Sequence, residues 1–199
     1  CCFINDAKEE SINTILEMAE YRKSGPCKAL IVTGCLAERY RQEILKEIEE
    51  VDAVIGTTAY DALPEILEQV FQGKKELKTE ELNRLVRTKA KRQLTSGGHY
   101  AHLKIAECCD KHSTYCIIPR IRGSYRSVPM EQLLEEAKEL AEQGVKELIL
   151  VAQETTLYGE DLYGEKSLGR LLDELNSIDG IYWIRLLYCY PEEIDAALI

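Results

Sequence analysis

Residues 28–35 read Lys-Ala-Leu-Ile-Val-Thr-Gly-Cys, a short apolar run that ends in a glycine and a cysteine. Such a run, preceded by the helix breakers Gly25 and Pro26, is typical of a buried strand in a parallel sheet. The strand would place Cys35 at its carboxyl end, where the ligand sites of open parallel sheets collect. This stretch therefore predicts a helix-covered sheet with a candidate site at one edge.

Helices and strands alternate on both sides of this run. Before it, Asp6 and Glu9 have the spacing of a capping box, which predicts a helix over about 6–22. Four apolar residues of that helix share one face: Ile12, Ile15, Leu16 and Ala19. After the run we expect a helix, a strand and a helix, over about 38–49, 51–55 and 60–72. This alternation implies an α/β fold with a parallel sheet.

The second half of the chain predicts another parallel unit. Its expected order is strand, cysteine-rich loop, helix, strand, helix and strand, with the regular elements over about 102–106, 130–143, 147–152, 168–175 and 182–187. We expect a first domain over 1–73, a charged linker over 74–100 and the start of a (β/α) barrel or open sheet over 101–199. The first sheet lacks a strand before its first helix, and the second would leave an apolar edge after three strands. Both ends of the chain are therefore expected to be truncated.

Composition narrows the class of protein. The chain has 199 residues, 45% of them hydrophobic and 30% charged, which is typical of a soluble globular protein. It has neither an apolar run of about 20 residues nor a basic-then-apolar leader, so we expect a cytoplasmic protein without a membrane segment. The net charge of −10 argues against a surface that binds nucleic acid throughout. The basic residues of 74–92 fit either a solvated linker or an edge that meets a nucleic-acid-rich partner.

Eight cysteines need an explanation in such a chain. Cys108, Cys109 and Cys116 are close together on a loop after a strand, which suits an iron-sulfur cluster because several sulfurs can converge on one centre. A zinc site is the alternative, but it favours two separated ligand pairs. His112 is either a fourth ligand or a solvated loop residue.

A first group of cysteines lies near the N-terminus. Cys1 precedes the first helix and Cys35 follows the next strand, so both are expected at the same sheet edge, either sharing a cluster or as unrelated thiols. Cys2 adjoins Cys1. Cys27 and Cys189 are interpreted as structural, Cys27 as a small buried hydrophobe.

Five stretches in order along the chain resemble the radical S-adenosylmethionine methylthiotransferases, and among them the RimO-like group that modifies a small-subunit ribosomal protein. The stretches are 3–11, 32–39, 110–123, 151–159 and 186–191. The resemblance implies an N-terminal methylthiotransferase α/β domain without its first strand, followed by the first half of a radical S-adenosylmethionine barrel. The remaining barrel and a C-terminal β-rich module would lie outside the chain. The tRNA adenosine methylthiotransferases of the MiaB type are the alternative, although they carry Gln-Asn where this chain has Gln153-Glu154.

The resemblance also implies two four-iron clusters. In the family the barrel loop supplies three cysteines, and the matching positions here are Cys109, Ser113 and Cys116. Cys1 and Cys35 match two ligands of the auxiliary cluster.

The implied cofactor is S-adenosylmethionine, with Tyr115 near its adenine and Gln153 and Glu154 at the cofactor-contacting motif. The implied reaction adds a methylthio group to the β-carbon of an aspartate of a small-subunit ribosomal protein. A reduced flavodoxin-like or ferredoxin-like protein would donate electrons, and direct RNA binding is permitted but not required. Two other functions remain open: a fragment that binds the ribosomal partner without catalysis, and a zinc or thiol-redox protein.

Three positions depart from the family pattern. Cys2 and Cys108 stand where glycine is usual, which predicts strained loops. Ser113 stands where a cluster ligand is usual, and a serine oxygen is a harder donor with a far higher pKa than a thiol. We therefore expect a weakened barrel cluster and impaired activity.

Overall fold

The computed structural model describes residues 2–86, 92–95, 97–194, 196 and 198–199. The chain divides into two compact units, considered separately below. The first unit comprises Cys1–Thr88 with Arg120–Gly123, and the second comprises Lys89–Pro119 with Ser124–Ile199. Within the described residues, none of the helices is long and apolar enough to cross a membrane.

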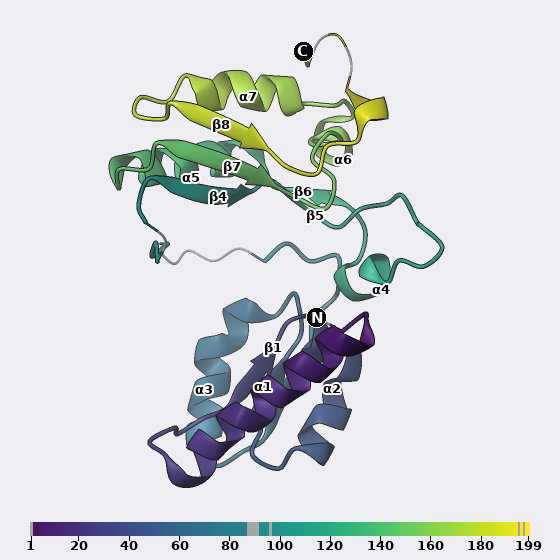
Figure 1. The fold of residues 1–199 in the computed structure, drawn as a ribbon, viewed down its shortest axis with the longest axis vertical. Helices are drawn as coiled ribbons and strands as arrows, with labels where there is room; N and C mark the ends of the chain where they lie inside the picture. The colour runs from purple at the N-terminus through teal and green to yellow at the C-terminus, as the bar shows by residue number, and fades with distance from the viewer. Residues whose placement is uncertain (1, 87–91, 96, 195, 197) are drawn as a thin grey trace. The chain divides into compact units, whose positions relative to one another are not determined.

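The first unit contains a three-stranded parallel sheet in the order β1-β2-β3, as expected for alternating strands and helices. Figure 1 labels β1 and the three helices α1, α2 and α3 of this unit. Its strands are β1 (Ile31–Thr33), β2 (Ala53–Ile55) and β3 (Glu76–Lys78). Its helices are α1 (Asn5–Ser24), α2 (Cys35–Glu47), the 3-10 turn η1 (Tyr60–Ala62) and α3 (Leu63–Phe71). Strand β3 lies inside the stretch 74–100 that was expected to be linker. The division into functional domains over 1–73 and 101–199 stays a prediction.

Strand β2 is the centre of this unit. All three of its residues are buried, as expected for the middle strand of a helix-covered sheet. Ala53 and Ile55 form an apolar cluster with Ile66 and Val70 of α3. Val54 faces the opposite side, because side chains alternate along a strand.

Helix α1 differs from expectation in two respects. It begins at Asn5 with Ile4 as its N-cap, and no side chain caps it, so the predicted capping box at Asp6 is wrong. The reason is that Asp6 already lies inside the first turn. The predicted apolar face is only half buried: Ile15 and Ala19 lie in the core, whereas Ile12 and Leu16 are 42% and 46% exposed.

The second unit is built on a parallel sheet in the order β4-β7-β8. Its strands are β4 (Tyr100–Lys104), β7 (Glu147–Val151) and β8 (Trp183–Leu186), beside a short antiparallel pair of β5 (Ala106–Glu107) and β6 (Arg126–Ser127). Its helices are α5 (Met130–Glu142), α6 (Glu160–Tyr163) and α7 (Leu168–Asn176), followed by the 3-10 turn η2 (Pro191–Glu193). Helix α4 (Ile118–Arg122) begins here and ends in the first unit. This strand-helix order is the one predicted for the start of a barrel.

The core of the second unit lies between the sheet and its two long helices (Figure 1). Alternate residues of β4 and β7, including Leu103 and Leu148, are fully buried against Leu133 of α5 and Leu171 of α7. Gly144, with φ at 95°, ends α5 in the left-handed conformation that glycine adopts without strain and lets the chain turn into β7.

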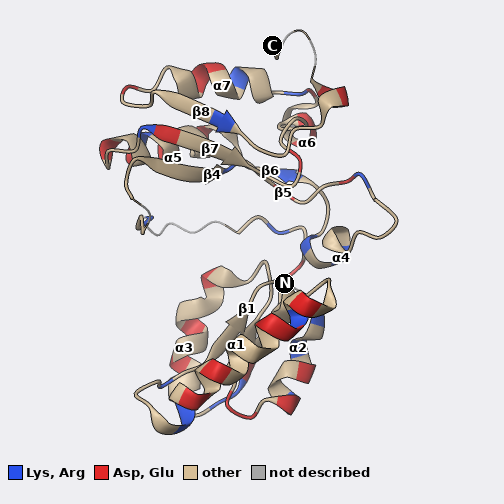
Figure 2. Ribbon diagram, viewed as in Figure 1, with Lys and Arg blue, Asp and Glu red and all other residues tan. Residues whose placement is uncertain are grey.

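Among the described residues, acidic and basic side chains occur in both units. Figure 2 shows acidic residues recurring along α1, α2, α5 and α7. Described basic residues of the 74–92 segment make contacts within the chain: Lys74 with Gln69, Lys75 with Glu49, Arg84 with Thr58 and Asp61, and Arg92 with His102 and Glu136. Arg87, Lys89 and Lys91 lie outside the described residues.

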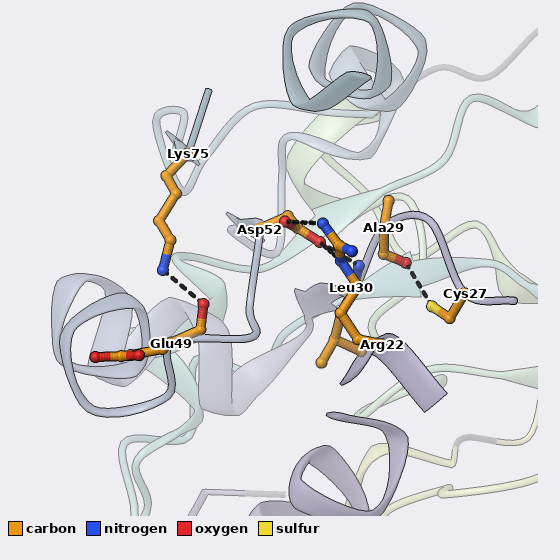
Figure 3. Close-up of polar contacts among 7 residues, drawn as sticks. All are labelled: Arg22, Cys27, Ala29, Leu30, Glu49, Asp52 and Lys75. Atoms are coloured by element: carbon orange, nitrogen blue, oxygen red, sulfur yellow. Dashed lines mark hydrogen bonds and ion pairs between the residues drawn. The ribbon is translucent and has the colours of Figure 1, made fainter. Parts of the chain in front are cut away.

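Asp52 joins three parts of the first unit (Figure 3). Its carboxylate accepts hydrogen bonds from Arg22 Nε at 2.9 Å and Arg22 Nη2 at 3.2 Å, and from the Leu30 N–H at 2.8 Å. Partial burial alone would raise the pKa of Asp52, but the hydrogen bonds from Arg22 and Leu30 outweigh it and leave this pKa below its usual value. Asp52 therefore fastens the end of α1 and the start of β1 to β2.

Replacing this carboxylate should destabilise the protein in a pH-dependent way. Asp52→Asn should cost about 2 kcal/mol of unfolding free energy at pH 7, because the Arg22 guanidinium loses its charged acceptor. The folded pKa is depressed, so the contribution is complete above the ordinary value of about 3.8 and is lost as the pH falls through the folded pKa. Urea unfolding of parent and variant at pH 7 and pH 3 measures this gap. Glu49→Gln is the control, because Lys75 contacts only the main-chain oxygen of Glu49 in Figure 3; an equal loss in both variants contradicts the assignment.

Candidate functional site

The cysteine loop, residues 108–117, connects β5 to α4 at the carboxyl end of β4. Cys109 and Cys116 are half-buried, whereas Ser113 is exposed. The Cys116 N–H donates a hydrogen bond to the Ser113 carbonyl at 2.9 Å, which closes a turn within the loop. Tyr115 is 76% exposed beside this turn. The loop thus carries two thiols, a serine hydroxyl and an aromatic ring at one edge of the sheet.

The donor set of this loop does not match a site with three thiolates. Across the part of the chain that the structure describes, there is no group of three or more His, Cys, Asp or Glu side chains placed to hold a metal ion. Ser113 brings a hydroxyl to the middle position, and His112 lies on the exposed side of the loop with φ at 47°. Two half-buried thiols remain, Cys109 and Cys116.

Cys108 is the third cysteine of this loop and adjoins Cys109. Its side chain is fully buried, and burial raises the pKa of its thiol, which favours the neutral form. Its backbone has φ at 67°, in the left-handed region that favours glycine. This confirms the strain expected from a cysteine at a usual glycine position.

Gln153 and Glu154 follow β7 and lie beside the start of the cysteine loop. The Gln153 side-chain oxygen accepts a hydrogen bond from the Cys108 N–H at 2.6 Å. Glu154 is fully buried, and its Oε1 accepts hydrogen bonds from the N–H and the hydroxyl of Thr156. Its Oε2 is buried without a hydrogen-bond partner among the described residues. A buried carboxylate oxygen in this state is an acceptor that a ligand can satisfy.

Two residues that the sequence did not single out support the same loop. The Asp110 carboxylate accepts a hydrogen bond from the Tyr125 N–H at 2.9 Å. The Tyr125 hydroxyl donates to the Glu154 carbonyl at 3.0 Å, and burial raises the pKa of Tyr125. The only feature of the sequence that could have indicated the contact between Asp110 and Tyr125 is the position of Asp110 directly after Cys109.

Lys111 anchors the middle of the loop. Its ammonium pairs with Glu193 of η2 and lies 4.9 Å from the centre of the Tyr190 ring. Glu193 also pairs with Lys166 at 2.8 Å. Hydrogen bonds from Lys111 and Lys166 lower the pKa of Glu193 to about 2. The loop is therefore held by the segment after β8 as well as by the end of β7.

In the first unit, Cys35 is the first residue of α2, directly after Gly34, whose φ is 97°. Arg122 Nη2 donates a hydrogen bond to Cys35 Sγ at 3.3 Å. Cys2 is fully buried, and Cys1 lies outside the described residues. The pairing of Cys1 with Cys35 therefore stays a prediction. Cys27 is half-buried rather than fully buried, because its chain position precedes β1 and its thiol reaches the nearby Ala29 carbonyl.

Comparison with known proteins agrees with this arrangement. Residues 1–56 match the family model named "Uncharacterized protein family UPF0004", and residues 103–194 match the Radical SAM superfamily. The whole chain is 65% identical to a protein of Lachnoclostridium phytofermentans, 51% identical to one of Acetivibrio thermocellus and 52% identical to one of Clostridium tetani. All three are named ribosomal protein uS12 methylthiotransferase RimO. The chain is thus similar over its whole length to proteins named as methylthiotransferases, and residues 103–194 match the Radical SAM superfamily.

The cysteine loop lies within the part of the chain that matches the Radical SAM superfamily. The radical S-adenosylmethionine match begins in β4 and ends after η2, so it includes the loop and the ends of all three long strands. The superfamily implies a four-iron cluster and S-adenosylmethionine. The chain spans 45% of the length of each of these three curated relatives.

Glu193→Gln should release Lys111 from its strongest partner. The pKa of Lys111 is raised, chiefly by its hydrogen bond to Glu193, so the variant should lower this pKa toward the ordinary lysine value. In the parent, the depressed pKa of Glu193 keeps both ion pairs formed until the pH falls to about 2. The measurement is the pH dependence of Lys111 acylation, followed by mass spectrometry.

Glu192→Gln, one residue away on the exposed side of η2, is the matched control. It should shift Lys111 less, because Glu192 acts on Lys111 only at longer range. Identical Lys111 profiles in the parent and in Glu193→Gln would show that the ion pair does not hold the loop in solution.

Proposed function

We propose that this chain functions as a methylthiotransferase, which adds a methylthio group to the β-carbon of an aspartate in ribosomal protein uS12. The observation that carries the proposal is the 65% identity over all 199 residues to a protein of that name. The names of the relatives favour a ribosomal protein over tRNA adenosine as substrate. The order of β4, cysteine loop, β7 and β8 supports the same reaction class.

S-adenosylmethionine fits the residues at the end of β7. We propose that Glu154 holds its ammonium group, because the buried Oε2 lacks a partner among the described residues and a cation would compensate its charge. Tyr115 is exposed beside the loop and is proposed to contact the adenine. Gln153 is proposed to border the same site. When bound, this cofactor supplies the radical and methyl-transfer chemistry.

The barrel cluster, in contrast, does not fit the loop of this chain. Three thiolates hold such a cluster in the family, whereas the loop presents Cys109, Cys116 and the hydroxyl of Ser113. The Cys108 side chain is fully buried, and burial raises the pKa of its thiol, so we propose that it does not replace the missing ligand. We therefore propose that this chain holds iron at the barrel site weakly or not at all.

The remaining assignments follow from the family. We propose that Cys1 and Cys35 contribute to an auxiliary cluster and that a reduced flavodoxin-like or ferredoxin-like protein donates electrons. The hydrogen bond from Arg122 Nη2 shows that Cys35 Sγ acts as an acceptor, which supports a donor sulfur at that position. We propose a cytoplasmic location, where the ribosomal substrate is found.

The test is the iron and acid-labile sulfide bound per chain after anaerobic reconstitution. Ser113→Cys should gain about one four-iron cluster relative to the parent, because it restores the third thiolate. Ser177→Cys is the matched control: it adds a thiol at an exposed position after α7 and should gain nothing.

Each outcome decides between functions. A gain in Ser113→Cys alone supports a radical enzyme site that lost one ligand. Iron in neither protein contradicts the enzyme proposal for this chain and favours a fragment that binds the ribosomal protein without catalysis. Stoichiometric zinc in place of iron would instead support a zinc protein.

A further inference from the structure

The start of the cysteine loop is held by bonds that involve no metal. The backbone of Cys108 is in the left-handed region at φ 67°, a conformation that is unfavourable for a non-glycine residue. Such a conformation persists only where its surroundings fix it. At Cys108 the fixing contact is the 2.6 Å hydrogen bond from its N–H to the Gln153 side-chain oxygen.

A second connection acts two residues further along the loop. Asp110 accepts the Tyr125 N–H at 2.9 Å, and the buried Tyr125 hydroxyl donates to the Glu154 carbonyl at 3.0 Å. Both connections therefore lead to the same place, the consecutive residues 153 and 154 after β7. Cys109 lies between the two anchored residues, so its backbone is fixed on either side.

We infer that Gln153 is a positioning residue that sets the backbone of Cys109 through the Cys108 N–H, before any cofactor is present. This role is distinct from the cofactor contact proposed above, and it does not depend on whether the loop binds iron. Its physical basis is preorganisation: a ligand held by its neighbours loses less conformational freedom when it binds.

The experiment uses the iron-free chain and compares Gln153→Leu with Gln153→Glu. Leucine removes the acceptor at similar size, whereas glutamate keeps an oxygen at the same reach. Gln143→Leu, at the exposed end of α5, is the matched control. The readouts are amide hydrogen exchange of the peptide containing Cys108 and the alkylation rates of Cys108 and Cys109, with Cys27 of the first unit as internal reference.

Loss of one hydrogen bond to a buried amide should open the loop start about tenfold more often. We therefore expect about tenfold faster exchange at Cys108 and faster alkylation of Cys108 and Cys109 in Gln153→Leu, with Cys27 unchanged. Gln153→Glu should restore the parent rates, which a loss of packing alone would not allow.

Two results would overturn the inference. One is unchanged exchange and alkylation in a folded Gln153→Leu variant. The other is equal acceleration at Cys27, or acceleration in Gln153→Glu as large as in Gln153→Leu, since either would show general loosening rather than loss of the acceptor. Because no iron is present, neither result depends on the cluster assay.

Discussion

Parallel pairing of β4, β7 and β8 is the constraint on which the candidate site depends. In a parallel sheet all carboxyl ends meet at one edge, so the segments that leave these three strands are brought together whatever their sequence separation. The hydrogen bonds across that edge reflect this: Cys108 reaches Gln153, Thr155 reaches Tyr188, and Lys111 reaches Glu193. Each contact joins the segment after one strand to the segment after another.

The elements that the sequence predicted well are those whose own apolar pattern matches their burial. The run at 147–152 alternates sides in β7, and the helix expected over 130–143 is α5 almost to the residue. The predictions that failed concern elements whose structure depends on contacts with other parts of the fold. The first helix has apolar residues on a wide face, but only Ile15 and Ala19 of that face are buried. The periodicity of a helix shows which residues share a face, but it does not show how much of that face the rest of the fold covers. Strand β3 is short and polar at its ends, and it is a strand because β2 offers it an edge.

The candidate site also contains residues that were predicted before the structure and residues that were not. Cysteines spaced within one loop are a local pattern, so Cys109 and Cys116 were visible in the sequence, whereas Gln153 and Glu154 were predicted only from the resemblance to the methylthiotransferases. Other residues that hold the loop, such as Tyr125 and Glu193, were not predicted. Tyr125 is 15 residues from Asp110, and Glu193 is 82 residues from Lys111. An ion pair across such a distance leaves no signature in a single sequence, because either partner alone is an ordinary charged residue.

The two unusual residues of the loop, Cys108 and Ser113, affect different properties: the first affects the loop backbone and the second affects the donor atoms. At Cys108 the side chain is buried and the strain lies in the backbone, so the consequence falls on loop geometry. At Ser113 the structural contact is the carbonyl that accepts the Cys116 N–H, and a carbonyl is the same in serine and cysteine. The turn therefore does not need the missing sulfur. A serine at position 113 therefore changes the donor atoms that the loop offers without changing the main-chain hydrogen bond that closes the turn.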